Sequence, residues 1–137
     1  MLKSPEQVVK HCIETSPQLA RLLGFRVYPI VAPVSAALPF VVYQRSVIER
    51  NQTLAMPVGV PRVSVQVDTY GTTYESAREI ADALRENLDG WNGSVYGVDV
   101  KHVALESERD GFVQLDGSEL PPVYQITQVF DVSWQET

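Results

Sequence analysis

The stretch Arg62 to Leu88, RVSVQVDTYGTTYESAREIADALRENL, decides the fold. Apolar and polar side chains alternate from Arg62 to Tyr70. If this segment is a strand, one of its faces holds Val63, Val65, Val67 and Thr69. A period of two that is rich in β-branched residues predicts a strand with one buried face.

The period changes to that of a helix after Gly71. Thr72 and Glu75 have the capping-box spacing, in which a hydroxyl and a carboxylate accept from the free N–H groups at a helix start. Asp89-Gly90 ends the pattern, because glycine readily takes the left-handed conformation after a helix. The apolar stripe between these ends comprises Tyr74, Ala77, Ile80, Ala81, Leu84 and Leu88. We therefore expect an amphipathic helix over about residues 73–89 that covers the buried face of the strand.

The segments on either side supply further elements. An N-terminal helix begins at Ser4-Pro5-Glu6-Gln7, ends or bends at Ser16-Pro17, and continues as a short helix that ends at Gly24. Strands are expected at Phe25 to Pro29, Phe40 to about Arg50, Tyr96 to about Glu108 and Val123 to Trp134, with turns at Trp91 to Ser94 and Arg109 to Gly111, and irregular chain from Phe112 to Leu120. This order predicts an α+β fold: a mostly antiparallel, roughly four- to five-stranded sheet with the N-terminal helix and the central helix packed on one face. Residues 1–137 form one domain in this interpretation.

Composition excludes several classes of protein. The chain has 137 residues and a formal charge of −6, from 17 acidic and 11 basic side chains. Tight binding to duplex DNA needs clustered Lys and Arg, so nucleic-acid capture is not expected. No apolar run approaches the roughly 20 residues of a membrane helix. The N-terminus lacks the apolar region of a signal peptide, and we expect the protein to stay in the cytosol of the cell that makes it.

The sequence offers no candidate catalytic, cofactor or metal site. Cys12 shares an apolar helix side and is interpreted as a buried small hydrophobe, and His102 as a histidine on a sheet face. Asp110, Asp116 and Glu119 lie in or near predicted loops, but they lack the ligand spacing of a calcium loop and favour solvated turn carboxylates. Glu106 and Glu108, two apart on a strand, are expected to share its solvated face.

The segment Asn51 to Pro61, NQTLAMPVGVP, is apolar yet interrupted by proline and glycine. It is either a hairpin loop whose apolar side chains fold back on the core, or an arm that packs on a neighbouring molecule. In the second interpretation the candidate interface residues are Leu54, Met56, Val58 and Val60.

Several stretches, in order, carry a resemblance to one family. They are Arg26 to Pro29 (RVYP), Leu38 to Tyr43 (LPFVVY), Val65 to Tyr70 (VQVDTY), the helix with Tyr74, Ala77, Ala81 and Leu84, and Tyr124 to Val132 (YQITQVFDV). Together they resemble the tail-completion proteins of long-tailed bacteriophages, also called tail terminator or tail-to-head joining proteins.

The resemblance implies a structural virion protein without catalysis or cofactors. Members assemble as a ring, typically a hexamer, that caps the head-proximal end of the tail tube, ends tube polymerisation and joins the tail to the head neck. The implied partners are further copies of the chain, the tail tube protein, a head-completion or neck protein, and DNA that passes without specific binding. The implied location is the tail or neck of the virion, after assembly in the host cytoplasm.

Two alternatives stay open at this point. One is another neck or tail adaptor of the virion with a similar fold. The other is a non-phage α+β domain that binds a small molecule or acts as an enzyme, with a pocket near His102 or Tyr43.

Overall fold

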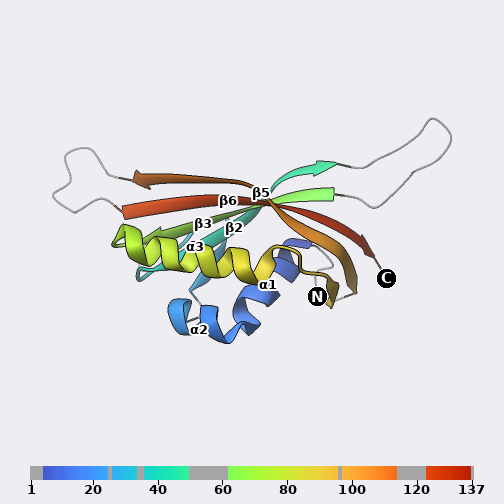
Figure 1. Ribbon diagram of the computed structural model, residues 1–137, viewed down its shortest axis with the longest axis horizontal. Helices are drawn as coiled ribbons and strands as arrows, with labels where there is room; N and C mark the ends of the chain where they lie inside the picture. Colours follow the sequence, from blue (N-terminus) through green and yellow to red (C-terminus); the bar gives the residue numbers. More distant parts are fainter. Residues whose placement is uncertain are drawn as a thin grey trace.

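The computed structural model describes residues 5–24, 26–33, 36–49, 62–95, 97–113 and 123–136. Within these ranges the chain forms three helices and a six-stranded sheet (Figure 1). In chain order the elements are α1 (Pro5–Thr15), α2 (Pro17–Leu23), β1 (Val27–Pro29), β2 (Phe40–Glu49), β3 (Arg62–Gly71), α3 (Tyr74–Leu88), β4 (Gly93–Val95), β5 (Val98–Val113) and β6 (Val123–Glu136).

The sheet has the order β1-β2-β3-β6-β5-β4 and is mixed. Strand β1 runs parallel to β2, and every other neighbouring pair is antiparallel. The α+β class and the mostly antiparallel order are thus confirmed, whereas the expected number of four to five strands is wrong, because the sheet has six. The additional strand, β4, occupies part of the turn expected at Trp91 to Ser94. It pairs with β5 through a tight turn in which Gly97 adopts a φ of 76°, a conformation open to glycine.

The turn expected at Arg109 to Gly111 is absent, and β5 continues through it to Val113. Asp110 pairs with Ile126 and Gly111 with Gln125 on the neighbouring strand β6. The local preference of Asp-Gly for a turn is therefore overridden by a ladder of hydrogen bonds between strands. Phe112, expected in irregular chain, belongs to the same strand.

The helix ends follow from local hydrogen bonds. Helix α3 is capped one residue later than expected: the hydroxyl of Thr73, not Thr72, accepts from the backbone N–H of Ser76 at 3.1 Å. At the other end Gly90 has a φ of 84°, as the left-handed position after a helix requires. The short helix α2 is confirmed, with Ser16 at its N-cap and Gly24, at φ 54°, at its C-terminal end.

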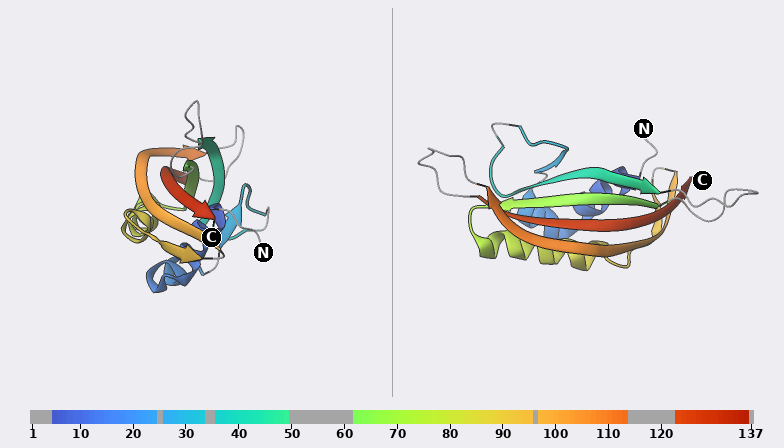
Figure 2. Two further views of the ribbon diagram at one scale, coloured as in Figure 1. Left: turned by 90° about the vertical axis from the view of Figure 1, so that its right-hand side faces the viewer. Right: turned by 90° about the horizontal axis from the view of Figure 1, so that it is seen from above.

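All three helices lie on one face of the sheet, and the core lies between the two layers (Figures 1 and 2). Seen from above, β2, β3, β6 and β5 run along the length of the molecule with the helices behind them (Figure 2). The core includes Val63, Val65 and Val67 of β3, Ile80, Leu84 and Leu88 of α3, and Phe130, Val132 and Trp134 of β6. Tyr74 departs from the expected stripe: it is 40% exposed and contacts the ring of Tyr124 at 6.3 Å between centroids.

The core contact between α3 and the sheet gives a direct stability prediction. Leu84 is fully buried, so Leu84→Ala should lower the free energy of unfolding by about 2–5 kcal/mol through lost burial and a residual cavity. Urea denaturation measures the loss. The adjacent Arg85→Ala, on the exposed side of the same helix, should stay within about 0.5 kcal/mol of the parent. Equal losses for the two variants would contradict this packing.

Candidate functional site

The interface residues expected from the sequence lie outside the described part of the chain. Leu54, Met56, Val58 and Val60 all fall within residues 50–61, between the end of β2 and the start of β3. Their assignment stays a prediction.

One such surface is the face of the sheet that points away from the helices, called the open face below. Alternate residues of β2, β3 and β6 form it, because side chains alternate across a strand. They are Phe40, Val42, Gln44, Ser64, Gln66, Asp68, Tyr70, Gln125, Thr127, Val129 and Asp131. An ion pair between Arg62 and Asp131 links β3 to β6 at one end of this face.

A carboxylate lies at the centre of the open face. Asp68 is only 4% exposed, and it accepts from the hydroxyl of Thr127 at 2.6 Å. It also accepts from the side-chain amide of Gln125 at 3.2 Å and from that of Gln66 at 2.9 Å. Two of these donors lie on β6, so the carboxylate ties β3 to its neighbour. Its oxygens are occupied by structural hydrogen bonds, which leaves no basis for a catalytic role.

A row of aromatic rings continues from this network across β1, β2 and β3. The ring centroids of Tyr28 and Phe40 lie 6.0 Å apart, and those of Phe40 and Tyr70 lie 5.0 Å apart. Gln125 donates to the Tyr70 hydroxyl at 3.2 Å. Burial raises the pKa of Tyr70, and the nearby Asp68 carboxylate raises it further. Protein–protein contacts are enriched in aromatic side chains, so this half-buried row of rings is suited to such a contact.

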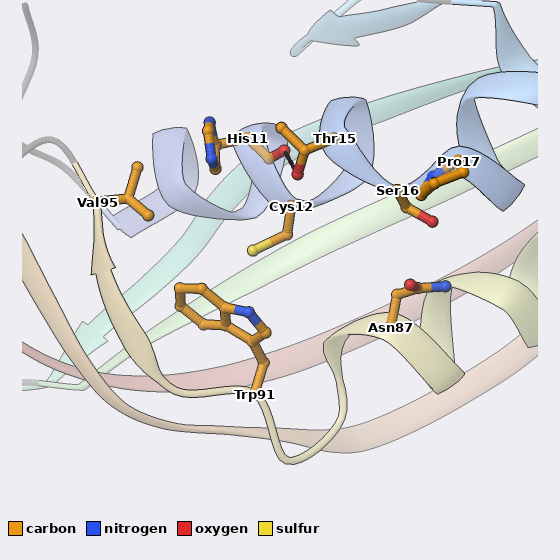
Figure 3. A pocket seen from close by; sticks show the side chains of 8 residues that line it. All are labelled: His11, Cys12, Thr15, Ser16, Pro17, Asn87, Trp91 and Val95. Carbon is orange, nitrogen blue, oxygen red and sulfur yellow. Dashed lines mark hydrogen bonds between the residues drawn. The ribbon is translucent and has the colours of Figure 1, made fainter.

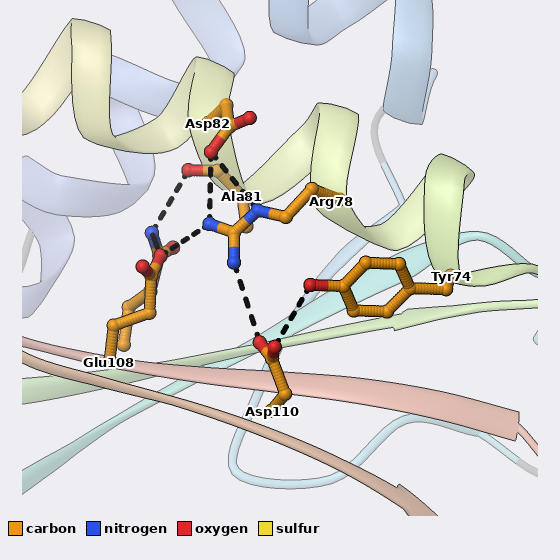
Figure 4. A network of polar contacts seen from close by, with 7 residues as sticks. Tyr74, Arg78, Ala81, Asp82, Glu108 and Asp110 are labelled. Atoms are coloured by element: carbon orange, nitrogen blue, oxygen red, sulfur yellow. Dashed lines mark hydrogen bonds and ion pairs between the residues drawn. The ribbon is translucent and has the colours of Figure 1, made fainter.

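On the other face, a second network joins α3 to β5 around Arg78 (Figure 4). The guanidinium donates to Asp82 at 2.9 Å and to Glu108 at 2.6 Å, and lies 3.4 Å from Asp110. The Tyr74 hydroxyl donates to Asp110 at 2.9 Å. Burial works to lower the pKa of Arg78, but hydrogen bonds, chiefly to Glu108, raise it above its usual range.

This network corrects two expectations about acidic residues. Glu108 does not share a solvated face with Glu106, because a register shift lies between Leu105 and Ser107 and Glu108 faces α3. Asp110 is neither a turn residue nor a free cation ligand, since it accepts from Tyr74 and Arg78. Asp116 and Glu119 lie outside the described residues. No group of three or more metal-ligating side chains occurs in the described chain.

A pocket of about 370 Å³ lies between α1, the end of α3 and β4 (Figure 3). Two of its polar side chains donate to backbone carbonyls of their own helices: Thr15 to that of His11 at 2.8 Å, and Asn87 to that of Ala83 at 2.7 Å. Asn87 also donates to the side chain of Gln18 on α2 at 3.5 Å. Cys12 points toward the indole of Trp91 in Figure 3 and is 8% exposed. Without convergent polar groups, the pocket is a packing groove between helices and not a reaction site.

The expected burial of Cys12 is confirmed and gives a pH prediction. Burial raises the pKa of its thiol from 9.0 to about 11. The thiol therefore ionises at a lower pH in the unfolded chain than in the folded protein. Its contribution to the free energy of unfolding is fully present below pH 9 and is lost as the pH rises toward 11. We expect a loss of up to about 2 kcal/mol in that window. Urea denaturation of the parent and Cys12→Ala across the window measures it; parallel curves for the two proteins would contradict it.

The Asp68 network predicts a stability loss on the open face. Asp68→Ala should lower the free energy of unfolding by about 1–3 kcal/mol, because it leaves the buried hydroxyl of Thr127 without its acceptor. Thermal or urea unfolding measures the loss. Asp99→Ala, which removes a carboxylate paired to Lys101 at the surface of β5, is the matched control and should leave the unfolding midpoint almost unchanged. An Asp68→Ala variant as stable as that control would show that the network contributes nothing.

Exposed apolar side chains at two places were missed by the sequence analysis. Ile30 and Val31, just after β1, are 70% and 73% exposed, and Ile30 has a φ of 65°, rare for a β-branched residue. Phe112 and Val113, at the end of β5, are 65% and 44% exposed. Phe112 and Val113 fall in chain that was expected to be irregular, and Ile30 and Val31 follow the end of the expected strand Phe25 to Pro29. Hydrophobic periodicity gives no signal at either place.

Comparison with known proteins identifies the family. The model of the family described as "Tail completion protein gp17" matches residues 6–119. A chain in the solved structure "Virion of native gene transfer agent (GTA) particle" has the same fold, with a TM-score of 0.73 and 16% identity over 92% of this chain and 90% of that chain. A search of curated proteins finds no match. No helix among the described residues is long and apolar enough to cross a membrane.

These findings confirm the resemblance and contradict the alternative of a non-phage ligand-binding or enzymatic domain. The family match covers most of the described helices and strands, including β3 and α3. The chain belongs to the family of phage tail completion proteins, and it is a structural protein of the virion tail and not an enzyme.

Proposed function

We propose that this chain caps the head-proximal end of the phage tail tube as a hexameric ring, ends tube polymerisation and joins the tail to the neck of the head. The observation that carries the proposal is the family match over residues 6–119. Support also comes from the likeness of nearly the whole chain to a chain of a virion particle.

The surfaces of the described chain suit a ring. A closed ring of identical subunits needs two different complementary patches on each copy, because its contacts run head to tail. The chain offers unlike surfaces: the aromatic and amide open face, and the apolar ends at Ile30-Val31 and Phe112-Val113. A charge of −6 suits a channel through which DNA passes without binding.

The segment 51–61 is the arm of this proposal. Leu54, Met56, Val58 and Val60 pack on a neighbouring copy or on the tail tube protein, because an apolar segment interrupted by proline and glycine fits poorly into a sheet interior. The tail tube protein and a head-completion protein are the partners on the two sides of the ring.

A double charge substitution tests the arm. Met56→Asp with Val58→Asp should shift the protein to smaller assemblies in native mass spectrometry, because two carboxylates cannot be buried in an apolar contact without large cost. The same variant should fail to restore tailed particles to a phage that lacks the protein. The matched control is Gln52→Asp with Thr53→Asp, which adds the same charge at polar positions of the segment. Unaltered assembly and tail joining in the Met56/Val58 variant would refute the arm.

A second candidate is an adaptor at another level of the neck or tail. The similar solved structure is described as a whole virion, and its description does not say which component the matching chain is. It is therefore compatible with an adaptor at another level. Electron microscopy of particles with a label fused to the chain separates the two, since only the first places the label at the junction of tube and neck.

A further inference from the structure

The open face of the sheet has an aromatic end. The rings of Tyr28, Phe40 and Tyr70 lie there, called the ring row below, and all three remain partly exposed. The surface beside them stays low, because Gly111 occupies the matching row of β5. A Cβ added at Gly111 would meet only the carbonyl oxygen of Gln125, at 3.9 Å. The ring row therefore has room for a further apolar segment on top of it.

The ring row is held in place by contacts within the chain. The planes of Phe40 and Tyr70 are tilted by 32°, and the ring of Tyr28 meets that of Phe40 edge-on at 68°. Gln125 donates to the Tyr70 hydroxyl and also to Asp68, each at 3.2 Å. A surface that is already ordered loses little conformational freedom when a partner binds, which favours its use as a receiving site.

The opposite end of the open face is mainly polar. Among the described side chains, Ser64 and Gln66 of β3 point to this face, and the ion pair of Arg62 with Asp131 lies at its end. Glu49 and Arg62 are opposite each other in the last row that β2 and β3 share. This end offers charged and amide groups where the ring row offers aromatic ones.

The apolar segment 51–61 starts from the polar end. Residues 50–61 connect Glu49 to Arg62, so both ends of the connection are fixed at that last row. The apolar side chains of the segment are Leu54, Met56, Val58 and Val60. The described surface beside the segment's ends is thus a poor match for its side chains.

The segment is too short to cover the ring row of its own chain. The distance along β3 from Arg62 to Tyr70 is about 26 Å, at a rise of about 3.3 Å per residue. Met56 stands six positions before Arg62, so even a fully extended chain takes its Cα no farther than about 21 Å from that residue. The chain also leaves β2 pointing away from the ring row, and the reversal shortens this reach further. A contact between the segment and a ring row therefore joins two molecules.

We propose that the ring row of one copy of this chain binds the segment 51–61 of a second copy, with Met56 and Val58 packed on the rings. The inference rests on the proposed ring and names the surface that its arm contacts. Apolar and aromatic side chains are removed from water together in this contact, and the thioether of methionine packs favourably against aromatic rings.

The positions of the two surfaces suit a closed ring of subunits. The segment starts at one end of β3 and the ring row lies at the other end, so the contact joins unlike surfaces of the two copies. In such a head-to-tail contact each copy keeps one segment and one ring row for its two neighbours, until the last copy closes the circle. The contact thus supplies the two different patches that a ring of identical subunits needs.

Photo-crosslinking from the segment tests the contact and leaves the ring row unchanged. The full chain carries Met56→benzoylphenylalanine and is irradiated after assembly. Crosslinks between copies appear on denaturing gels at the mass of a dimer and above, whereas crosslinks within one chain stay at the mass of the monomer. In digests of the dimer band, they should fall on the tryptic peptides 27–45, which holds Tyr28 and Phe40, and 63–78, which holds Tyr70.

The matched control places the same group on the exposed side of α3. Arg85→benzoylphenylalanine should give no dimer band with crosslinks to those rings. Native mass spectrometry of the same samples separates this inference from the proposed ring. A ring whose crosslinks from position 56 miss Tyr28, Phe40 and Tyr70 overturns the contact and leaves the ring intact. A protein that stays monomeric and crosslinks only within its own chain overturns both.

Discussion

The close contact between β3 and α3 is the constraint on which the rest of the structure depends. Gly71 ends the strand where the helix begins its approach, and a Cβ added there would lie 3.1 Å from the backbone nitrogen of Ala77. With the helix so close, the valine face of β3 must face the core, because a shift of register by one residue would expose it. Strands β2 and β6 pair with β3, so the orientation of their faces is fixed as well. Helices α1 and α2 then lie on the same side of the sheet as α3.

Polar side chains serve this architecture in two separate ways. Asp68 gathers amides and a hydroxyl on the open face and ties β3 to β6. Arg78 reaches from α3 to Glu108 and Asp110 and holds β5 against the helix layer. Both groups are saturated by partners within the chain. A protein whose work is assembly needs rigid surfaces, and here Asp68 and Arg78 fix the geometry of the sheet and of the helix layer.

The sequence predicted the parts of the fold with a strong period and missed those without one. The valine alternation of β3, the stripe of α3 apart from Tyr74, and the short helix α2 that begins at Pro17 are confirmed. Three-residue strands such as β4 have no measurable period, and the Asp110-Gly111 turn signal was overridden by pairing with β6. For the site, apolar composition pointed to the segment 51–61. Ile30 and Val31 gave no signal, because their exposure depends on which strands become neighbours in space.

The tie between α3 and β5 has a mechanical consequence. A strand can slip along its neighbour by two residues and keep its facing, because side chains repeat with a period of two. Strand β5 cannot slip along β6 in this way without breaking the contacts of Arg78 with Glu108 and Asp110, which hold it to α3. The helix therefore locks the register of β5 through charged side chains as well as through packing.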